Sequence, residues 1–330
     1  MKAWLLDSFT GLSAMRLAEV SEPAPGPGEV VLDVRYAALN PADRYLAEAQ
    51  YPAKPPLPHI LGRDAVGTVS AVAGDISAWK PGDAAVVLRS EVGVSRAGTF
   101  AERVAVPAEC LVPIPAGWTS EQAAGATLVY LTAHQALTQW ADLPSAAIVL
   151  ITGASGGVGV ASMQLGNALG HTPVALSRGT SKRDALLRAG AVAVFDPTDA
   201  DWRTRLKEFL KPRRVDLAID NVGGPLFNDV IDTLADRGRV SCVGRLAGPV
   251  PQFNTASLFF RRLKVGGVAV GANTIAESRA GWQTIVDLLD RTGARPLVDR
   301  IFAFEQLPGA FARLAQGPLG KVLLRVKAGS

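Results

Sequence analysis

Hydrophobic and polar positions change their pattern at about residue 119 of this 330-residue chain. Before that point, short Val-rich runs end at Pro- and Gly-containing turns such as "KPGD". Runs of this kind predict β-strands. They are "EVVLDVRYAALN" (29–40), "GTVSAVA" (67–73), "DAAVVL" (83–88) and "TFAERVAVPA" (99–108). Strands this short and this frequent favour a compact β-barrel or folded sheet in the first third of the chain.

After residue 119 helix-like and strand-like segments alternate. Thr119 and Gln122 have capping-box spacing and open a segment rich in Ala and Leu, which predicts a long helix. The strand-like runs between 148 and 271 are "AIVLITGA", "TPVALSR", "AVAVFDP", "VDLAIDNV", "RVSCVG" and "LKVGGVAVG". Strands that are apolar on both faces and alternate with helices predict a parallel doubly wound sheet.

The end of the chain departs from this alternation. One helix-like segment, "ESRAGWQTIVDLLDRTG", is followed by a pattern of strand, helix and strand. Because the alternating sheet is complete before it, we expect this end to return to the first domain. The predicted fold class is α/β, with predicted domain segments 1–120, 121–272 and 273–330.

Composition narrows the class of protein. The chain is 48% hydrophobic and 19% charged with a net charge of +4, as in a soluble protein with a sizeable core. Lys and Arg are scattered, which argues against nucleic-acid binding. Cys110 and Cys242 lie far apart, so no disulfide framework is expected. The N-terminus is a poor signal peptide and no apolar run has transmembrane length, so we expect a cytoplasmic protein without a membrane partner.

A glycine-rich loop stands between the first alternating strand and its helix, within "VLITGASGGVGVASMQLG" (149–166). Ala154, Gly156 and Gly159 fall on the spacing of the dinucleotide-binding fingerprint, with Ala in place of the first glycine. The helix that begins near Gly157 would point its free N–H groups at phosphates. The residues expected to contact the cofactor in this loop are Ala154, Ser155, Gly156, Gly157, Val158 and Gly159.

The second alternating strand indicates which dinucleotide is bound. NAD-binding relatives of this fold place Asp or Glu near its end to bind the ribose 2′-hydroxyl. This chain has Ser177 and Arg178 there, with Lys182 one helical turn later. A hydroxyl and two cations suit a 2′-phosphate, so we expect NADPH. The alternative is that Arg178 and Lys182 are solvated surface charges.

These stretches, together with "PHILGRDAVGTV", "GATLVYLTAHQAL", "DNVGG" and "GKVLL", resemble the medium-chain dehydrogenase/reductase superfamily. The branch they resemble is that of the zinc-independent quinone oxidoreductases, which includes zeta-crystallin. The resemblance implies a GroES-like, partly β-barrel catalytic domain (1–120 and 273–330) and a Rossmann domain (121–272). It also implies a homodimer or tetramer that pairs through the edge of the Rossmann sheet, for which "LKVGGVAV" is the candidate strand.

The same resemblance bears on zinc. Arg63 and Asp64 stand where zinc-dependent relatives carry His-Glu, and "LNPADRY" stands where they carry a Cys ligand. A catalytic zinc needs three protein ligands, and the chain's three histidines are His59, His134 and His171. We therefore expect no metal, and we expect Arg63 and Asp64 to form a buried salt bridge.

The resemblance also assigns site residues. Asn40 and Tyr45 would flank the nicotinamide and the substrate, and Tyr45 could donate a hydrogen bond or a proton, or only pack its ring. Asp43 is expected to cap the turn after Pro41. The further residues expected at the cofactor are Thr127, Asn221, Val243, Gly244 and Arg245. Lys321 matches a recurrent family lysine, although a solvated lysine is an equal alternative, and Phe259-Phe260 is expected either in the nicotinamide pocket or in the core.

The function expected from these features is that of an NADPH-dependent reductase. Its substrate would be a quinone or an α,β-unsaturated carbonyl, and the cofactor would carry the redox chemistry. Two alternatives stay open: an enoyl-thioester reductase, and a nucleotide-binding protein with little turnover.

Overall fold

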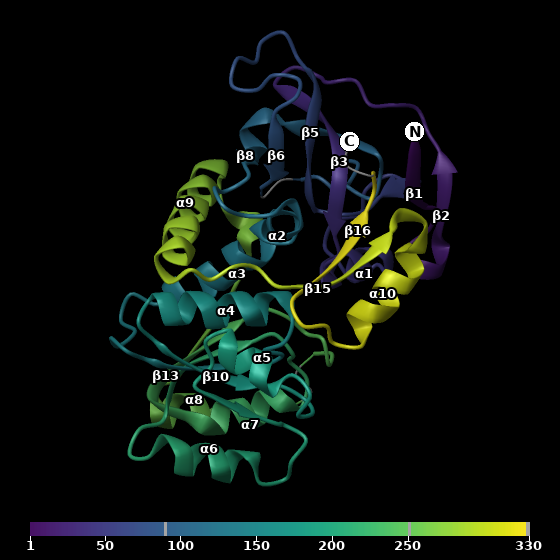
Figure 1. Cartoon of the computed structure of the whole chain (residues 1–330). Coiled ribbons are helices and arrows are strands. Elements are labelled where there is room, and N and C mark those ends of the chain that lie inside the picture. The colour runs from purple at the N-terminus through teal and green to yellow at the C-terminus, as the bar shows by residue number, and fades with distance from the viewer. Residues whose placement is uncertain (89–90, 250–251, 328–330) are drawn as a thin grey trace. The chain divides into compact units, whose positions relative to one another are not determined.

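The computed structural model of the chain describes residues 1–88, 91–249 and 252–327. The chain divides into two compact units (Figure 1). Unit 1 comprises Met1–Leu128, Asn273–Ala280 and Arg295–Ser330, and unit 2 comprises Val129–Ala272 and Gly281–Ala294. Compared with the predicted segments, unit 1 also includes residues 121–128, and unit 2 also includes residues 281–294. These units are defined by contacts, and the predicted domain boundaries stay a prediction.

Unit 2 is built on a six-stranded parallel sheet. Its strands are β9 (Ile148–Ile151), β10 (Thr172–Leu176), β11 (Ala193–Phe195), β12 (Val215–Asp220), β13 (Leu234–Cys242) and β14 (Lys264–Gly267). Their spatial order is β11-β10-β9-β12-β13-β14, and every neighbouring pair is parallel. Numbered within the sheet, this is the order 3-2-1-4-5-6 of the doubly wound dinucleotide-binding fold. The predicted α/β fold class is confirmed.

Helices cover both faces of this sheet. The helical elements from Thr127 to Thr292 are α3 (Thr127–Thr138), α4 (Gly157–Ala168), α5 (Arg183–Arg188), α6 (Trp202–Leu210), α7 (Leu226–Thr233), α8 (Ala256–Arg261), a short 3-10 turn (Val270–Ala272) and α9 (Ile275–Thr292). In Figure 1, α4 lies above the strands, and α6, α7 and α8 lie below them. All four residues of β9 are buried, as expected for a central strand covered on both faces.

Unit 1 is mostly antiparallel β-structure. Its elements are β1 (Lys2–Leu6), β2 (Met15–Glu19), β3 (Glu29–Ala38), α1 (Pro41–Ala47), β4 (His59–Ile60), β5 (Asp64–Val72), β6 (Ala84–Val87), β7 (Arg103–Pro107), β8 (Leu111–Pro113), α2 (Ser120–Ala124), β15 (Val298–Ala303), α10 (Leu307–Ala315) and β16 (Lys321–Arg325), with 3-10 turns at Leu12–Ala14, Ala108–Cys110 and Phe304–Gln306. The larger sheet has the order β15-β16-β3-β5-β6-β8, and β7 also pairs with β3. A smaller sheet has the order β2-β1-β4.

The C-terminal strand closes the core of unit 1. β16 pairs antiparallel with β3, with Leu323 opposite Ala38. Phe311 of α10 packs edge-on against Phe100, with ring centroids 6.0 Å apart and an interplanar angle of 83°. Both rings belong to one buried cluster that includes Leu32. Residues from the two ends of the sequence therefore share one core.

The long helix expected after Thr119 is wrong, because the structure has two helices there. Thr119 does form the predicted capping box with Gln122, but α2 ends at Ala124 and α3 begins at Thr127. Gly125 lies between them, where an added Cβ would lie only 2.9 Å from the Cγ of Lys321. The side-chain stem of Lys321 occupies the space that a Cβ would need, so glycine is required between the two helices.

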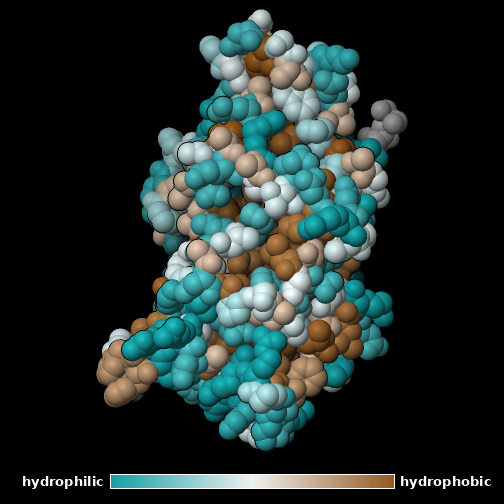
Figure 2. Space-filling model, turned by 90° about the vertical axis from the view of Figure 1, so that its left-hand side faces the viewer, coloured by the Kyte–Doolittle hydropathy of each residue, from teal (hydrophilic) through white to brown (hydrophobic). Residues whose placement is uncertain are grey.

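The surface combines hydrophilic and hydrophobic side chains, as the face in Figure 2 shows. Phe259 and Phe260 are 64% and 80% exposed, so the expectation that they are core residues is wrong. Among the residues that the structure describes, no helix is long and apolar enough to cross a membrane.

Candidate functional site

The glycine loop of unit 2 connects β9 to α4 in the predicted order of strand, loop and helix. Gly153 has a φ of 58°, in the left-handed region that favours glycine. A Cβ on Gly159 would lie 2.5 Å from the carbonyl oxygen of Ala154, so only glycine fits there. The first turn of α4 therefore packs directly against the loop.

The N-terminus of α4 offers unpaired donors to an anion. Gly156 is its N-cap residue, and no side chain in the described part of the chain caps this helix. Gly157, Val158 and Gly159 form the first turn, where an α-helix provides no internal acceptor for the backbone N–H groups. These N–H groups and the positive end of the helix dipole can hold a pyrophosphate.

The structure brings the cations after β10 close to this loop. Lys182 Nζ lies 3.3 Å from Ser155 Oγ. Ser177 directly follows β10 and is buried, and its backbone N–H donates to the carbonyl of Phe195 at 3.0 Å. Arg178 is exposed. Ser155 and Lys182 are thus in contact, and Arg178 is available to a ligand from solvent.

Asp196 adds an acidic group that sequence reasoning missed. Its Oδ2 accepts the N–H of Gly179 at 2.6 Å, directly after Arg178. Burial would raise the pKa of Asp196, but hydrogen bonds from Thr198 and Gly179 and the charge of Arg178 outweigh it and lower the pKa. The carboxylate of Asp196 therefore lies beside this turn. It directly follows β11, whereas the acidic residue of NAD-binding relatives follows the second strand.

A buried polar cluster lies where β9 and β12 end. Thr152 Oγ1 donates to Asp220 Oδ1 at 2.7 Å and accepts the N–H of Asn221 at 2.9 Å. The Asp220 carboxylate also accepts the N–H of Gly223 at 3.1 Å. Asn221 Nδ2 donates to the Thr152 carbonyl at 2.8 Å, while Asn221 Oδ1 is buried without a hydrogen-bond partner among the described residues.

The predicted residues after β13 lie against this cluster. The N–H groups of Val243 and Gly244 donate to the Asp220 carbonyl at 2.9 and 3.2 Å. A Cβ on Gly244 would lie 2.7 Å from the carbonyl oxygen of Asn221, so this turn also needs glycine. Arg245 is exposed at the end of the turn. The carboxyl ends of β9, β12 and β13 therefore meet at one edge of the sheet, where such sheets bind ligands.

Unit 1 has a second buried polar cluster, centred on Asp64. Asn40 Nδ2 donates to Asp64 Oδ2 at 2.9 Å, and Lys321 Nζ lies 3.3 Å from the same oxygen. Lys321 Nζ also donates to Asn40 Oδ1 at 2.7 Å, and Thr127 Oγ1 lies 3.2 Å from Asp64 Oδ1. Lys321 is only 5% exposed, so the alternative of a solvated lysine is wrong.

The ion pairs of this region differ from the expected one. Asp64 pairs with Lys321, and Arg63 Nε lies 3.4 Å from Asp43 Oδ1, so the expected Arg63–Asp64 pair is wrong. Asp43 Oδ2 accepts the Asn40 N–H at 2.8 Å, which confirms that Asp43 caps this turn. Burial raises the pKa of Asp43 to about 6, although Arg63 and the Asn40 N–H oppose the shift.

Tyr45 lies on α1, the helix that follows Asn40. Its side chain is half-buried, and the guanidinium carbon of Arg44 lies 5.5 Å from the centre of its ring. The structure thus places Asn40 and Tyr45 on one short segment. Their assignment to the substrate side stays a prediction.

The groups around Asp64 do not make a zinc site. They are one carboxylate, one amide, one hydroxyl and the ammonium of Lys321, whereas zinc takes Cys, His and carboxylate donors. Over the ranges that the structure describes, no group of three His, Cys, Asp or Glu side chains could hold a metal ion.

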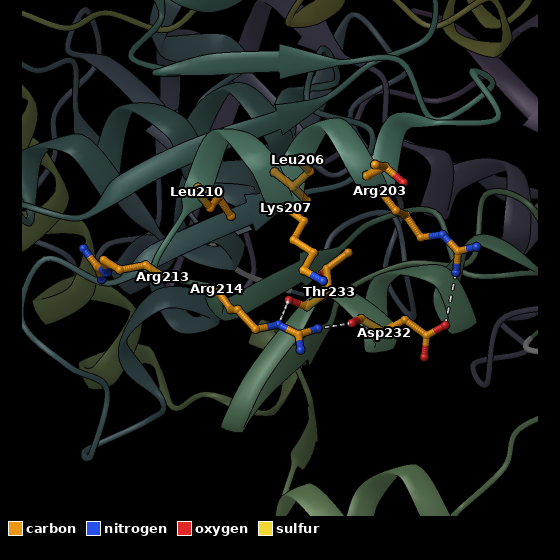
Figure 3. Close-up of a pocket in the computed structure, with 9 residues that line it drawn as sticks. Arg203, Leu206, Lys207, Leu210, Arg213, Arg214, Asp232 and Thr233 are labelled. Carbon is orange, nitrogen blue, oxygen red and sulfur yellow. Dashed lines mark hydrogen bonds and ion pairs between the residues drawn. The ribbon is translucent and has the colours of Figure 1, made fainter.

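One pocket of about 330 Å³ lies away from all of these residues, beside α6 and the end of α7 (Figure 3). Two of its arginines have protein partners: Arg203 pairs with Asp229 and Asp232, and Arg214 donates to the Asp232 and Thr233 carbonyls. Cations at the C-terminus of a helix are favourable. We interpret this pocket as a solvated face of unit 2 rather than as a candidate site.

Comparison with known proteins identifies the class. Residues 26–116 match the alcohol dehydrogenase GroES-like domain, and residues 157–291 match the zinc-binding dehydrogenase family. A candidate alcohol dehydrogenase from Sinorhizobium meliloti is 30% identical, with 98% of this chain and 96% of that chain covered and a TM-score of 0.90. A mycobacterial protein solved in complex with NADPH is 27% identical, with 99% and 100% covered and a TM-score of 0.88.

A relative with an assigned activity indicates the branch of this class of proteins. The quinone oxidoreductase of Sus scrofa is 26% identical over 98% of this chain and 97% of its own length. The chain belongs to the medium-chain dehydrogenase/reductase superfamily, in its zeta-crystallin-like branch.

Proposed function

We propose that this chain is an NADPH-dependent oxidoreductase that reduces a quinone or an α,β-unsaturated carbonyl compound. The main observation in support of this proposal is the arrangement of the glycine loop and the turn after β10. Lys182 contacts Ser155 of the loop, and Arg178 is exposed beside it. A pyrophosphate at the loop and a 2′-phosphate at these cations would both be neutralised.

NADPH is preferred over NADH in this proposal for two reasons. The turn after β10 carries two cations and a hydroxyl, and the mycobacterial structural relative was solved with NADPH. Asp196 acts in the opposite direction, because an ionised carboxylate beside Arg178 reduces the net positive charge of the turn. We therefore expect a preference for NADPH rather than exclusive use of it.

The chain's own groups have separate tasks in this reaction. Bound NADPH supplies the hydride. The first turn of α4 holds the pyrophosphate, while Ser177, Arg178 and Lys182 hold the 2′-phosphate. Tyr45 stabilises the substrate oxygen by donating a hydrogen bond from its hydroxyl.

The proposed substrate class is based on the side chains around Asp64 and on the activity of a relative. Alcohol oxidation by zinc-dependent members uses a Lewis acid, which the groups around Asp64 do not suit. Reduction of a quinone or an activated double bond needs no metal, and the porcine relative is a quinone oxidoreductase. Elemental analysis of the purified protein is expected to find no stoichiometric zinc. Near one zinc per chain, lost together with activity on chelation, would contradict this.

The decisive experiment is steady-state oxidation of NADPH and of NADH against a panel of substrates. The panel contains ortho- and para-quinones, short enals and enoyl thioesters. Turnover with quinones or enals and with NADPH in preference supports the proposal. Faster turnover of enoyl thioesters favours an acyl reductase, and tight NADPH binding without turnover on any substrate favours a binding protein.

The variant Tyr45→Phe separates the two substrate types, because it keeps the ring and removes only the hydroxyl. Enone reduction needs a proton at the α-carbon and charge stabilisation at the oxygen, so its kcat is expected to fall about 10²–10⁴-fold. Quinone reduction is expected to fall less, because the reduced oxygens can take protons from water. NADPH affinity measured by fluorescence titration should not change. Unchanged rates on both substrates would mean that Tyr45 only packs.

We also propose a homodimer formed through β14, with a tetramer as the alternative. β14 is the last strand in the order of the sheet. Phe259 and Phe260 shortly precede it, largely exposed, with their rings 4.4 Å apart. Light scattering should report a dimer, and Phe259→Ser/Phe260→Ser should shift it toward monomer. The matched control is Phe209→Ser on α6, where Phe209 is 52% exposed. A monomeric wild-type protein would rule out the dimer.

A further inference from the structure

Asp196 lies directly beside the turn that follows β10. β10 and β11 are parallel neighbours, with Leu176 opposite Phe195, so Ser177 and Asp196 leave the sheet side by side. The Ser177 N–H donates to the Phe195 carbonyl at 3.0 Å. In open α/β sheets of this order the adenosine half of a dinucleotide lies over the carboxyl end of the second strand, which is β10 here. The carboxylate of Asp196 is thus placed at the expected position of the adenosine ribose.

Hydrogen bonds fix this carboxylate but leave part of its acceptor capacity unused. Oδ2 accepts the Gly179 N–H at 2.6 Å, and Oδ1 accepts the N–H and the hydroxyl of Thr198 at 2.8 and 2.7 Å. No other residue in the described part of the chain donates a hydrogen bond to Asp196. An ionised carboxylate has about four acceptor positions, so one position on Oδ2 is left for a further donor.

The carboxylate is ionised and partly exposed. Burial raises the pKa of Asp196, but hydrogen bonds from Thr198 and Gly179 and the charge of Arg178 outweigh it and lower the pKa, so the group is an anion at neutral pH. The side chain is half-buried, which leaves it accessible to a ligand. The acids that follow in sequence differ, because Asp199 and Asp201 both pair with Arg205.

We propose that Asp196 is a specificity-determining residue whose carboxylate accepts a hydrogen bond from the adenosine ribose 2′-hydroxyl of NADH. Arg178 holds the 2′-phosphate of NADPH at the same turn, so the turn has one group for each cofactor. NAD-binding forms of this fold carry such an acid at the end of the second strand, whereas here it follows the third strand, β11. The inference rests on the proposed function, because it requires a nicotinamide dinucleotide bound at the glycine loop.

The test compares the two cofactors in one variant by fluorescence or calorimetric titration. Asp196→Ala removes the acceptor for the 2′-hydroxyl and a negative charge beside the 2′-phosphate. NADH is expected to bind about 2- to 13-fold more weakly, by the value of one hydrogen bond. NADPH is expected to bind about 1.4- to 5-fold more tightly, because one solvated charge has a small effect. A general loss of structure cannot produce these opposite changes.

Two control variants separate this contact from other effects. Thr198→Val removes one hydrogen bond to the carboxylate and keeps its charge, so both affinities should stay close to those of the wild type. Asp236→Ala removes an exposed acid near the start of β13, at the opposite end of the sheet, and controls for the change in net charge. Circular dichroism confirms that each variant is folded.

Opposite changes for NADH and NADPH in Asp196→Ala support the inference. Tighter binding of NADPH with unchanged binding of NADH means that Asp196 acts through its charge alone, which overturns the inference. Weaker binding of both cofactors means that Asp196 only stabilises the turn, and this also overturns it. A wild-type protein that binds NADPH but not NADH has the same consequence.

An analogue of NADH identifies the donor. The 2′-deoxyadenosine analogue lacks the 2′-hydroxyl but keeps the adenine and the 3′-hydroxyl, so Asp196→Ala should not change its affinity. A loss as large as that for NADH means that the adenine amino group or the 3′-hydroxyl is the donor, and the inference is then wrong. Failure of the proposed function looks different, because the wild-type protein would then bind neither NADPH nor NADH.

Discussion

The two buried polar clusters, one in each unit, differ in how completely their own groups pair with one another. In unit 1 both ends of the Asn40 amide have protein partners, and Asp64 Oδ2 accepts from Asn40 and Lys321. The Thr127 hydroxyl lies 3.2 Å from Asp64 Oδ1 and 2.8 Å from the Val87 carbonyl oxygen. In unit 2 the Thr152–Asp220 pair is also buried, yet the Asn221 amide keeps one acceptor that no donor among the described residues meets. An unpaired buried acceptor costs about 1–3 kcal/mol, so a cluster that retains one gains by binding a donor.

This difference assigns the two clusters different tasks. In the Asp64 cluster the carboxylate of Asp64 pairs with the ammonium of Lys321, and the cluster fixes α1 and the start of α3. We therefore expect substitutions in this cluster to lower mainly the free energy of unfolding. In unit 2 the Asn221 amide oxygen has no partner among the described residues and Arg178 after β10 is exposed, so we expect the loss of these groups to weaken ligand binding. Asn40 and Thr127 use their side-chain groups within the first cluster, so a direct contact of either with the cofactor stays a prediction.

The largest expected effect is on the Asp64 cluster. Lys321→Met keeps the apolar stem and removes the ammonium, which leaves the Asp64 carboxylate buried without its counter-ion. Breaking a buried ion pair in this way costs about 3–5 kcal/mol. Urea titrations of wild-type and variant, followed by circular dichroism and total tryptophan fluorescence, measure this loss as a difference in the free energy of unfolding.

A matched variant and a double variant test the reason for this loss. Lys327→Met removes a partly exposed partner of Asp33 and is expected to cost about 0–1 kcal/mol. Lys321→Met/Asp64→Asn removes both charges and should regain part of the loss, because no charge is then left unpaired. If the double variant is as unstable as the sum of the two single variants, the ion pair is not what stabilises this region.

The next effect is a pH dependence from Asp43. Its pKa is raised from 3.8 to about 6 by burial, so between these values the folded state binds more protons than the unfolded state. The contribution of Asp43 to stability is then fully present below pH 3.8 and is lost as the pH rises to about 6, by about 3 kcal/mol. The stability of the wild-type protein minus that of Asp43→Asn should fall over this window. A difference that stays flat from pH 4 to 6 would contradict the raised pKa.

The fold was predictable because its signals are local. Alternating apolar runs and the loop from Gly153 to Gly159 define the parallel sheet, and the capping box at Thr119 marks a helix start. The need for glycine at position 125 was not predictable, because the side chain that leaves no room for a Cβ there is Lys321 on β16. Helix propensity describes the segment itself and says nothing about a neighbour contributed by the other end of the chain.

The site was predictable to a smaller extent. The glycine loop and the cations after β10 are sequential features, and Lys182 does contact Ser155. The partners of Asn40 were missed because Lys321 lies 281 residues away in sequence, and Asp196 was missed because it follows β11 rather than β10. The pairing of buried charges depends on which strands are neighbours in the sheet. The spacing of residues in a single sequence does not predict that strand order.

A smaller effect is expected at the open side of unit 2. If Arg178 binds the 2′-phosphate as proposed, Arg178→Ala removes a charge-assisted hydrogen bond worth about 1.5–3 kcal/mol, so NADPH should bind about 10- to 150-fold more weakly. NADH has no 2′-phosphate and its affinity should barely change. Arg188→Ala, at the far end of α5, is the control for a general loss of positive charge. Equal losses for both cofactors would show that Arg178 supports the turn and does not recognise the phosphate.

The smallest effect is expected at Lys182, which links the turn after β10 to the loop. Its ammonium lies 3.3 Å from Ser155 Oγ, on a side chain that is only partly buried. An ion pair at a partly solvated position contributes about 0.2–1 kcal/mol, so Lys182→Met should weaken NADPH by about 1.4- to 5-fold. Added salt should narrow the gap between wild-type and variant, because salt screens an exposed charge. The affinity for NADH reports on the contact with Ser155 alone, since NADH carries no 2′-phosphate. If Lys182→Met weakens NADH as much as NADPH, the lysine acts by holding Ser155 in the loop, and recognition of the 2′-phosphate depends on Arg178 and Ser177.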